Sequence, residues 1–261
     1  MKTEKYYYKE MLAARLSANV VEVLLDQHAI VLDRTIAYPE GGGQLSDQGV
    51  IRWQGHEHEH EHEQKVRFID AQKKGGYPLF QDDFPAINVN TKVLHMIHPD
   101  DQPLLEQLQA GDTVEISIDI ERREQLSLSH TAAHVVYMAL ERIRPELVAG
   151  LIGCSIRPEG ARFDFLVDER IYPEEVAEFE QCCQQLVEAD HAVHLFNVEG
   201  QDEAWYWQAD DCTMPCGGTH LASIGPIGRI ELSRKRLGKG KERLNIRFPE
   251  AQYNYDKYQG V

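Results

Sequence analysis

Short runs in which apolar and polar residues alternate occupy much of the first half of the chain. Segments at 20–25, 29–32, 66–70, 92–98 and 113–118 are rich in Val, Ile and Leu, and glycines and prolines punctuate the region. A period of two places apolar side chains on one face of a β-strand. Several short strands divided by turn residues predict a small β-barrel.

The pattern becomes helical at about residue 121. Residues 121–142 contain neither Gly nor Pro, which predicts a long helix. Strands are expected near 152–156 and 161–167, a helix at about 173–189, and further strands around a loop at 210–220. The mixed order predicts an α+β protein with two domains, a β-barrel domain over 1–119 and an α+β domain over 120–261.

Two histidines four residues apart lie within the predicted helix. His130 and His134 share one helical face, so both imidazoles can reach a single ion. More than eighty residues later, Cys216 stands between Pro215 and two glycines, and His220 lies four residues after Cys216. A proline and two glycines at these positions favour a tight loop. Imidazoles and a thiolate suit zinc, which tolerates tetrahedral nitrogen and sulfur coordination. The two histidines of the helix, the cysteine and the histidine of the loop therefore form a candidate Zn²⁺ site.

Each half of this ligand set is weak evidence alone. A histidine pair at helical spacing is more often surface or buried structure than a metal ligand. A closed zinc site with four protein ligands can also be purely structural, because catalytic zinc usually keeps a position for water.

Motifs spread along the chain together resemble a known protein family. They are His-Thr-Ala-Ala-His at 130–134 after Arg122-Arg123, Arg-Phe-Asp-Phe at 162–165, Cys-Gly-Gly-Thr-His at 216–220, and the glycine-rich stretch from Tyr38 to Gln44 with Asp47 and Gly49. Their order and spacing are similar to the editing domain of alanyl-tRNA synthetases, to the small barrel domain before it, and to the freestanding medium-length AlaX editing proteins. The resemblance covers nearly the whole chain. Its cysteine motif contains Cys216 and not Cys212.

The resemblance implies a trans-acting deacylase that hydrolyses the ester between a wrong amino acid and the 3′ end of alanine tRNA. It implies serine as that amino acid, with glycine as the alternative, and no obligate protein partner. A synthetase pocket shaped for alanine rejects a similarly sized analogue weakly, so a second hydrolytic site must complete the discrimination. The candidate catalytic residues, considered for reading the serine hydroxyl, are Gln44, Thr131 and Thr219.

Two other functional classes share parts of this pattern. A zinc hydrolase of small esters or peptides would share the ligands, but Thr131 stands where zinc proteases carry a general-base Glu. A tRNA-binding module with structural zinc would contact RNA without hydrolysis. The zinc itself either activates a water or positions the substrate, and both roles stay open at this stage.

The charge distribution is uneven. The formal net charge of −16 argues against nonspecific binding of a polyanion. Residues 229–247 carry eight Lys or Arg against two Glu, a local charge of +6 that leaves −22 on the rest. Arg234, Lys235 and Lys239 are therefore candidates to hold tRNA phosphates, and a solvated basic hairpin is the alternative.

Several smaller expectations complete the sequence analysis. No apolar run reaches membrane-spanning length and no signal-peptide core follows Met1, so no membrane contact and a cytoplasmic location are expected. Five cysteines, two of them adjacent, favour reduced thiols. Alternating His and Glu at 56–63 predict a solvated hairpin tip. Ser129 is expected to cap or start the helix, and Trp205 and Trp207 to lie on one side of a strand and pack in a core.

Overall fold

The computed structural model describes residues 2–55, 63–80 and 84–260, and the chain forms two compact units. The first consists of Met1–Gly41, Ser46–Arg123 and Tyr255–Val261, and the second of Gly42–Leu45 and Glu124–Asn254. The last three residues of the glycine-rich stretch, 42–44, therefore belong to the second unit. The domain ranges 1–119 and 120–261 stay a prediction. The histidine-rich run at 56–63 lies, apart from Glu63, outside the described residues.

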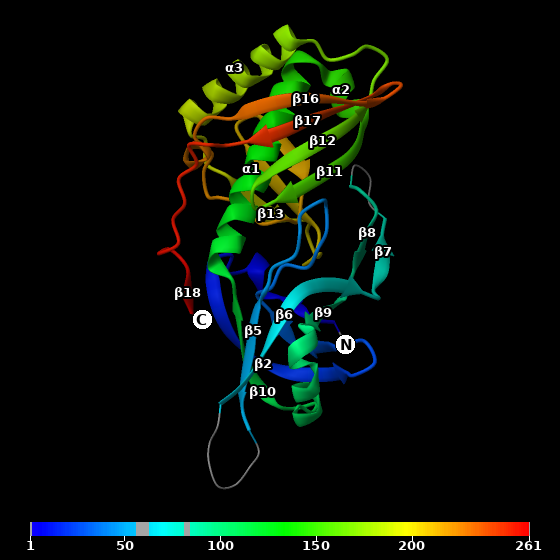
Figure 1. The fold of residues 1–261 in the computed structure, drawn as a ribbon, viewed down its shortest axis with the longest axis vertical. Coiled ribbons are helices and arrows are strands. Elements are labelled where there is room, and N and C mark those ends of the chain that lie inside the picture. Colours follow the sequence, from blue (N-terminus) through cyan, green and yellow to red (C-terminus); the bar gives the residue numbers. More distant parts are fainter. Residues whose placement is uncertain (1, 56–62, 81–83, 261) are drawn as a thin grey trace. The chain divides into compact units, whose positions relative to one another are not determined.

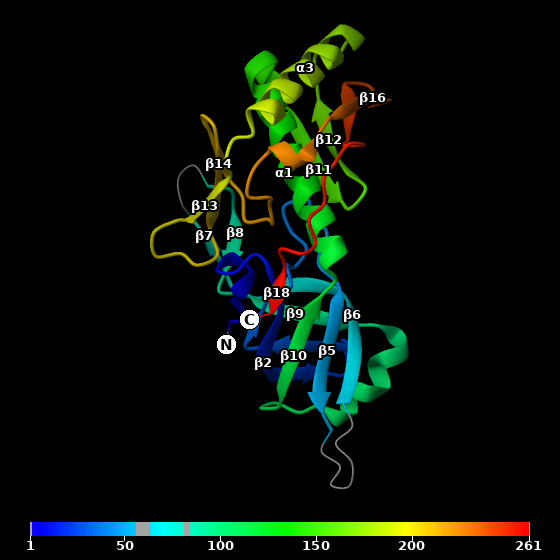
Figure 2. The ribbon, with the colours of Figure 1, turned by 90° about the vertical axis from the view of Figure 1, so that its left-hand side faces the viewer.

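The first unit is built on a closed β-barrel. Its sheet has the order β10-β5-β6-β9-β3-β2, and an additional pairing of β10 with β2 closes it (Figure 2). These strands are β2 (Ala13–Leu24), β3 (Ala29–Leu32), β5 (Gly49–Gln54), β6 (Glu63–Lys74), β9 (Lys92–Ile97) and β10 (Thr113–Ile118). All neighbouring pairs are antiparallel, and inward side chains such as Ile51, Phe68 and Ile116 form the core. The predicted small barrel is confirmed.

Shorter elements surround the barrel strands of this unit. The terminal strand β18 (Gln259–Gly260) pairs in parallel with β2. The others are β1 (Glu4–Lys5) with β4 (Arg34–Thr35), β7 (Tyr77–Leu79) with β8 (Ile87–Val89), and the 3-10 helices η1 (Tyr6–Tyr8) and η2 (Pro99–Gln107).

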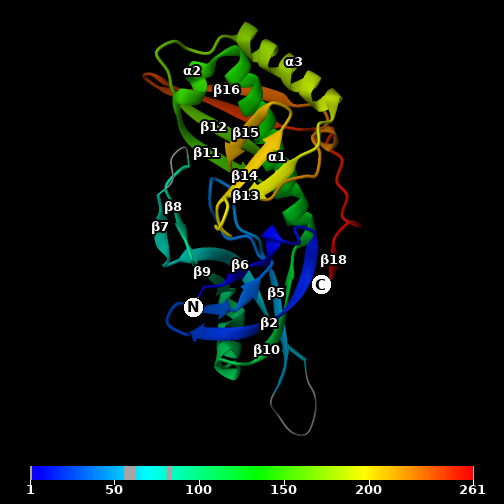
Figure 3. The same cartoon turned by 180° about the vertical axis from the view of Figure 1, so that it is seen from behind.

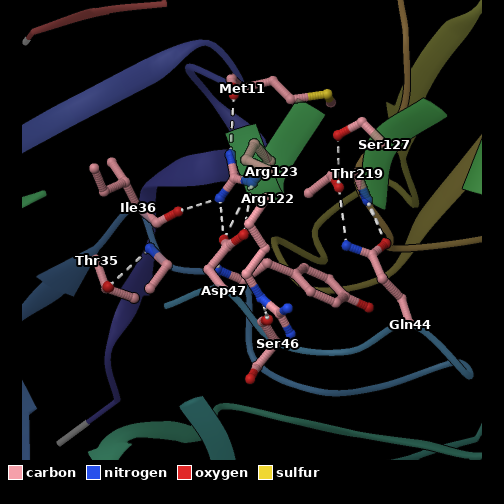
Figure 4. A network of polar contacts seen from close by, with 12 residues as sticks. Met11, Thr35, Ile36, Gln44, Ser46, Asp47, Arg122, Arg123, Ser127 and Thr219 are labelled. Atoms are coloured by element: carbon pink, nitrogen blue, oxygen red, sulfur yellow. Dashed lines mark hydrogen bonds and ion pairs between the residues drawn. The ribbon is translucent and has the colours of Figure 1, made fainter. Parts of the chain in front are cut away.

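A buried ion pair lies between the barrel and the first turn of helix α1 (Ile120–Ile143). Arg123 binds both carboxylate oxygens of Asp47, and both side chains are fully buried (Figure 4). The guanidinium also donates to the carbonyl oxygens of Ile36 at 2.6 Å and Met11 at 3.1 Å, while Asp47 accepts from the backbone N–H of Tyr38 at 2.6 Å. These additional bonds matter because a buried charge is tolerated only when it is paired and hydrogen-bonded.

Helix α1 begins immediately after the last barrel strand. Asp119 caps it, since its carboxylate accepts from the backbone N–H of Arg122 at 3.0 Å. Ser129 lies well inside the helix and is fully buried, so the expectation that it caps or starts the helix is wrong. The cap belongs to the residue where the extended strand conformation ends.

The second unit packs α1 between two sheets (Figures 1 and 3). The larger is antiparallel in the order β11-β12-β17-β16, and the smaller has the order β13-β14-β15. Their strands are β11 (Leu151–Arg157), β12 (Gly160–Leu166), β16 (Glu231–Gly238), β17 (Lys241–Arg247), β13 (His194–Asn197), β14 (Trp205–Ala209) and β15 (Cys212–Pro215). Helix α3 (Pro173–Ala189) contacts β16, and the short α2 (Pro145–Ala149) and η3 (Gly225–Ile227) complete the unit. The predicted α+β class is confirmed.

The core of this unit consists of the apolar positions of α1 and α3 and one face of each sheet. Phe163, Leu244 and Phe179 are buried there. Trp207 is also fully buried in this core, as expected, whereas Trp205 is only partly buried. Among the helices of the described residues, none has the length and hydropathy to cross a membrane.

Candidate metal centre

Four potential metal ligands converge in the second unit. His130 and His134 project from the same face of α1, while Cys216 and His220 follow strand β15, and one donor atom from each lies within 4.8 Å of the others. The Cys216 Sγ is 3.5 Å from Nε2 of His130 and 3.3 Å from Nε2 of His220. A tetrahedron with zinc–nitrogen and zinc–sulfur bonds of ordinary length has a nitrogen–sulfur edge of about 3.5 Å. The donor chemistry and spacing therefore fit a zinc ion.

The loop that carries Cys216 packs tightly against the helix. The backbone N–H of Cys216 donates to the carbonyl oxygen of Trp205 at 2.8 Å, which extends the pairing of β14 with β15 up to the ligand. At Gly218, an added Cβ would lie 2.2 Å from Cε1 of His130. Glycine is therefore required at 218, because the backbone lies directly against an imidazole ring.

Hydrogen bonds determine the orientation of two of the imidazoles. His130 Nδ1 donates to Gln44 Oε1 at 2.8 Å, so its Nε2 carries the lone pair and faces Cys216. His220 Nδ1 contacts Thr131 Oγ1 at 3.3 Å. This hydroxyl already donates to the carbonyl oxygen of Ser127 at 2.8 Å, so it accepts the proton of His220. Such bonds from the second ring nitrogen select the tautomer and orientation of metal-binding histidines.

Gln44 joins the glycine-rich stretch to both ligand-bearing segments. Its Oε1 also accepts from the backbone N–H of Thr219 at 3.1 Å, and its Nε2 donates to Thr219 Oγ1 at 2.9 Å (Figure 4). Ser127 Oγ donates to the same threonine hydroxyl at 2.9 Å. The backbone on either side of Gln44 bonds to Ile156 of β11, with distances of 2.8 and 3.2 Å. Strand β11 therefore fixes the backbone around Gln44, and His130 and Thr219 fix its side-chain amide.

His134 has a more apolar environment. Its ring contacts the Trp207 ring edge-on, with 4.6 Å between centroids. Its Nδ1 is buried and, within the described part of the chain, has no hydrogen-bond partner. The neighbouring rings of His130 and His220 lie 4.8 and 4.6 Å away between centroids. Position on the helix and packing against Trp207 therefore orient this imidazole.

Burial controls the protonation of the cluster. It lowers the pKa of His130 to about 3. Burial, followed by repulsion from neighbouring imidazoles, also places the pKa values of His134 and His220 well below the usual range. The three rings are therefore neutral ligands at neutral pH. Burial raises the pKa of the Cys216 thiol to about 12, so binding a metal as thiolate displaces a proton.

The structure brings together every residue that the sequence analysis selected for the site. Gln44, Thr131 and Thr219 are buried and bonded to the ligand-bearing segments. Ser127 was missed, although it lies three and seven residues before the two helical ligands and so shares their face. Cys212 is not part of the ligand cluster found among the described residues, and its Sγ lies 3.9 Å from a carboxylate oxygen of Glu141.

The candidate phosphate-binding residues differ in their surroundings. Arg234 forms a bidentate pair with Glu242, which is largely buried, and the Nη2–Oε1 distance is 2.7 Å. This pair leaves less of the guanidinium edge for a phosphate. Lys235 and Lys239 are exposed and have no ion-pair partner within the described part of the chain.

Known proteins resemble this chain over most of its length. The alanyl-tRNA editing protein AlaX-M of Pyrococcus horikoshii is 28% identical over 94% of this chain and 97% of that protein. The chain is similar to this editing protein over nearly its whole length. The resemblance expected from the sequence is confirmed.

Alanine–tRNA ligases match as well, but as longer proteins. That of Methanopyrus kandleri is 32% identical over 85% of this chain, and that of Thermococcus kodakarensis is 30% identical over 97%. These alignments cover 23% and 26% of the ligases, so the chain spans about a quarter of their length. No protein-family model matches the chain.

Proposed function

We propose that this protein is a trans-acting aminoacyl-tRNA deacylase that removes a wrong amino acid, serine in the first place and glycine as the alternative, from alanine tRNA. The observation that carries the proposal is the convergence of His130, His134, Cys216 and His220 in a chain that aligns with AlaX-M over nearly its whole length. Cytoplasmic location stays a prediction.

We propose zinc as the metal of this site, held by the four converging side chains. When bound, it would supply a Lewis-acidic positive centre. The residues of the chain prepare the site by holding the rings in place. Gln44 and Thr131 keep the Nδ1 protons of His130 and His220 away from the centre, and Thr219 connects the ligand loop to Gln44. These three residues thus act as positioning residues.

Selectivity for serine requires a polar group that reads its hydroxyl. A buried partner distinguishes serine from alanine because alanine leaves that partner unpaired. Reading of the hydroxyl by Gln44, Thr131 or Thr219 stays a prediction. The hydroxyl or amide groups of all three form hydrogen bonds within the site, which supports a role in positioning the metal ligands.

The decisive experiment incubates zinc-loaded protein with seryl-, glycyl- and alanyl-tRNA of the alanine type and follows loss of the ester. We expect seryl-tRNA to be hydrolysed much faster than alanyl-tRNA. The matched control is His134→Ala, for which we expect elemental analysis to show loss of zinc and the assay to show loss of hydrolysis. Equal rates on the seryl and alanyl esters would contradict an editing function.

The same measurements separate the alternatives. A tRNA-binding module with structural zinc would bind RNA and leave every ester intact. A hydrolase of small esters would cleave a simple serine ester as readily as the seryl-tRNA. Hydrolysis that persists after loss of zinc, in a variant that remains folded, would show that the reaction does not require the metal.

A further inference from the structure

The outer face of the four-stranded sheet carries a shallow basic groove. Five cationic side chains and one acidic side chain, Glu159, line it. The cations come from all four strands: Arg157 of β11, Arg162 of β12, Lys235 of β16, and Arg243 and Arg247 of β17. This concentration stands out in a chain whose formal net charge is −16.

Strand register explains why these residues share one face. Successive side chains of a strand alternate between faces, and the buried residues of β17, such as Leu244 and Ile246, point to the core. Arg243, Asn245 and Arg247 therefore point outward. Their cross-strand partners follow the same parity, with Lys235 opposite Arg243 and Arg162 opposite Asn245. The face is consequently polar along its length.

The groove combines anchored and available cations. Arg243 is fixed by Asp164, at 2.5 and 2.8 Å between guanidinium and carboxylate. Arg157 contacts only a hydroxyl, that of Ser155 at 3.4 Å, and Lys235 and Arg247 have no ion-pair partner within the described part of the chain. All three available cations are exposed.

We propose that this groove binds the sugar–phosphate backbone of RNA, and the proposal rests on the proposed function. Four strands at about 4.8 Å spacing span about 14 Å, which is the length of several phosphates along one strand of a duplex. Arginine forks match phosphate oxygens in geometry as well as charge. The strongly acidic remainder of the chain repels the same backbone and so confines it to this face.

The groove ends at the strand that borders the metal site. Strand β11 is one of the two edge strands of this sheet, and Ser155 and Arg157, which line the groove, flank Ile156. Ile156 pairs with Gln44, whose amide accepts from His130. An RNA backbone that crosses the sheet toward β11 therefore reaches the strand to which the glycine-rich stretch with Gln44 is bonded.

Binding of uncharged alanine tRNA, titrated over a series of salt concentrations, tests the groove without any ester chemistry. The test variant is Lys235→Gln with Arg247→Gln. Each phosphate contact contributes roughly 0.7 to 0.9 to the slope of log affinity against log salt, so we expect the slope to fall by about 1.5. Adding Arg157→Gln, on the far strand of the sheet, is expected to lower the slope by about a further 0.8.

The matched control is Arg236→Gln with Lys241→Gln. These cations lie on the same hairpin and change the net charge equally, but they do not line the groove. The control is expected to keep the parent slope. An unchanged slope in the groove variant, or an equal fall in the control, overturns the proposal. Absence of hydrolysis on every ester would overturn the proposed function instead, and the slopes would still decide the groove.

Discussion

Replacing Gln44 by alanine is the most informative perturbation of the metal centre. The substitution removes three hydrogen bonds: those from His130 Nδ1 and Thr219 N–H to Oε1, and that from Nε2 to Thr219 Oγ1. A buried hydrogen bond contributes about 1 kcal/mol on average, and a buried donor left unpaired costs at least as much. We therefore expect the free energy of unfolding to fall by about 3 kcal/mol.

Zinc affinity should fall as well, for a separate reason. Without Gln44, nothing in the observed bonding of His130 keeps the proton on Nδ1, and the ring is free to present Nε2–H toward Cys216. Loss of a partner that orients a metal-binding histidine typically costs 10- to 100-fold in affinity, or about 1.4 to 2.7 kcal/mol. Hydrolysis of the seryl ester should decline in parallel at limiting zinc.

Competition with a chromophoric chelator measures the zinc affinity, and urea denaturation measures stability. Gln44→Glu keeps an oxygen that can accept from both His130 Nδ1 and the Thr219 N–H, so it is expected to recover most of the zinc affinity. Glu40→Ala, an exposed change in the same stretch, should resemble the parent protein. A folded Gln44→Ala variant with parental zinc affinity would refute the assignment of Gln44 as the residue that orients His130.

Two further predictions concern the barrel unit. Asp47→Asn should lower the free energy of unfolding by about 3 to 5 kcal/mol because it leaves the buried Arg123 charge uncompensated, and a loss below 1 kcal/mol in urea denaturation would contradict this. His95 donates from Nδ1 to the carbonyl oxygen of Ile30, and burial lowers the pKa of its imidazole from 6.5 to about 4. As the pH falls, the unfolded chain therefore takes up this proton before the folded protein does. The free energy of unfolding should fall by about 3 kcal/mol between pH 6.5 and 4. The His95→Asn variant should lose this part of the pH dependence. An NMR signal of the His95 imidazole that titrates near pH 6.5 in the folded protein would contradict the reasoning.

The features that could be predicted from sequence are those that depend on neighbouring residues. Strand β10 over 113–118 and helix α3 over 173–189 coincide with the expected ranges, because period and turn residues are local signals. The two halves of the ligand set are also local, one a helical pair and the other a glycine-flanked loop. Their resemblance to a family supplied the information that the halves belong together.

The remaining features depend on contacts between distant residues. Gln44 lies 86 residues from His130, and Asp47 lies 76 residues from Arg123, so no periodicity connects either pair. Serine is a residue type that favours helix caps, but the strand before the helix ends at Ile118, and Asp119, the next residue, caps the helix instead of Ser129. The basic groove was equally out of reach, because it unites strands whose pairing order, β11-β12-β17-β16, is not the order of the chain.

The hydrogen bonds between Gln44 and Thr219 join residues 175 positions apart in the chain. Closing a loop of this size costs conformational entropy before the contact returns any stabilisation, so such contacts form late in folding. The helix with its two histidines can form early from local interactions, yet its rings acquire their oriented partners only when the glycine-rich stretch and the ligand loop meet. Metal capture in this arrangement is an event of the nearly native chain, and a metal ion present during synthesis would stabilise the finished fold more than any intermediate.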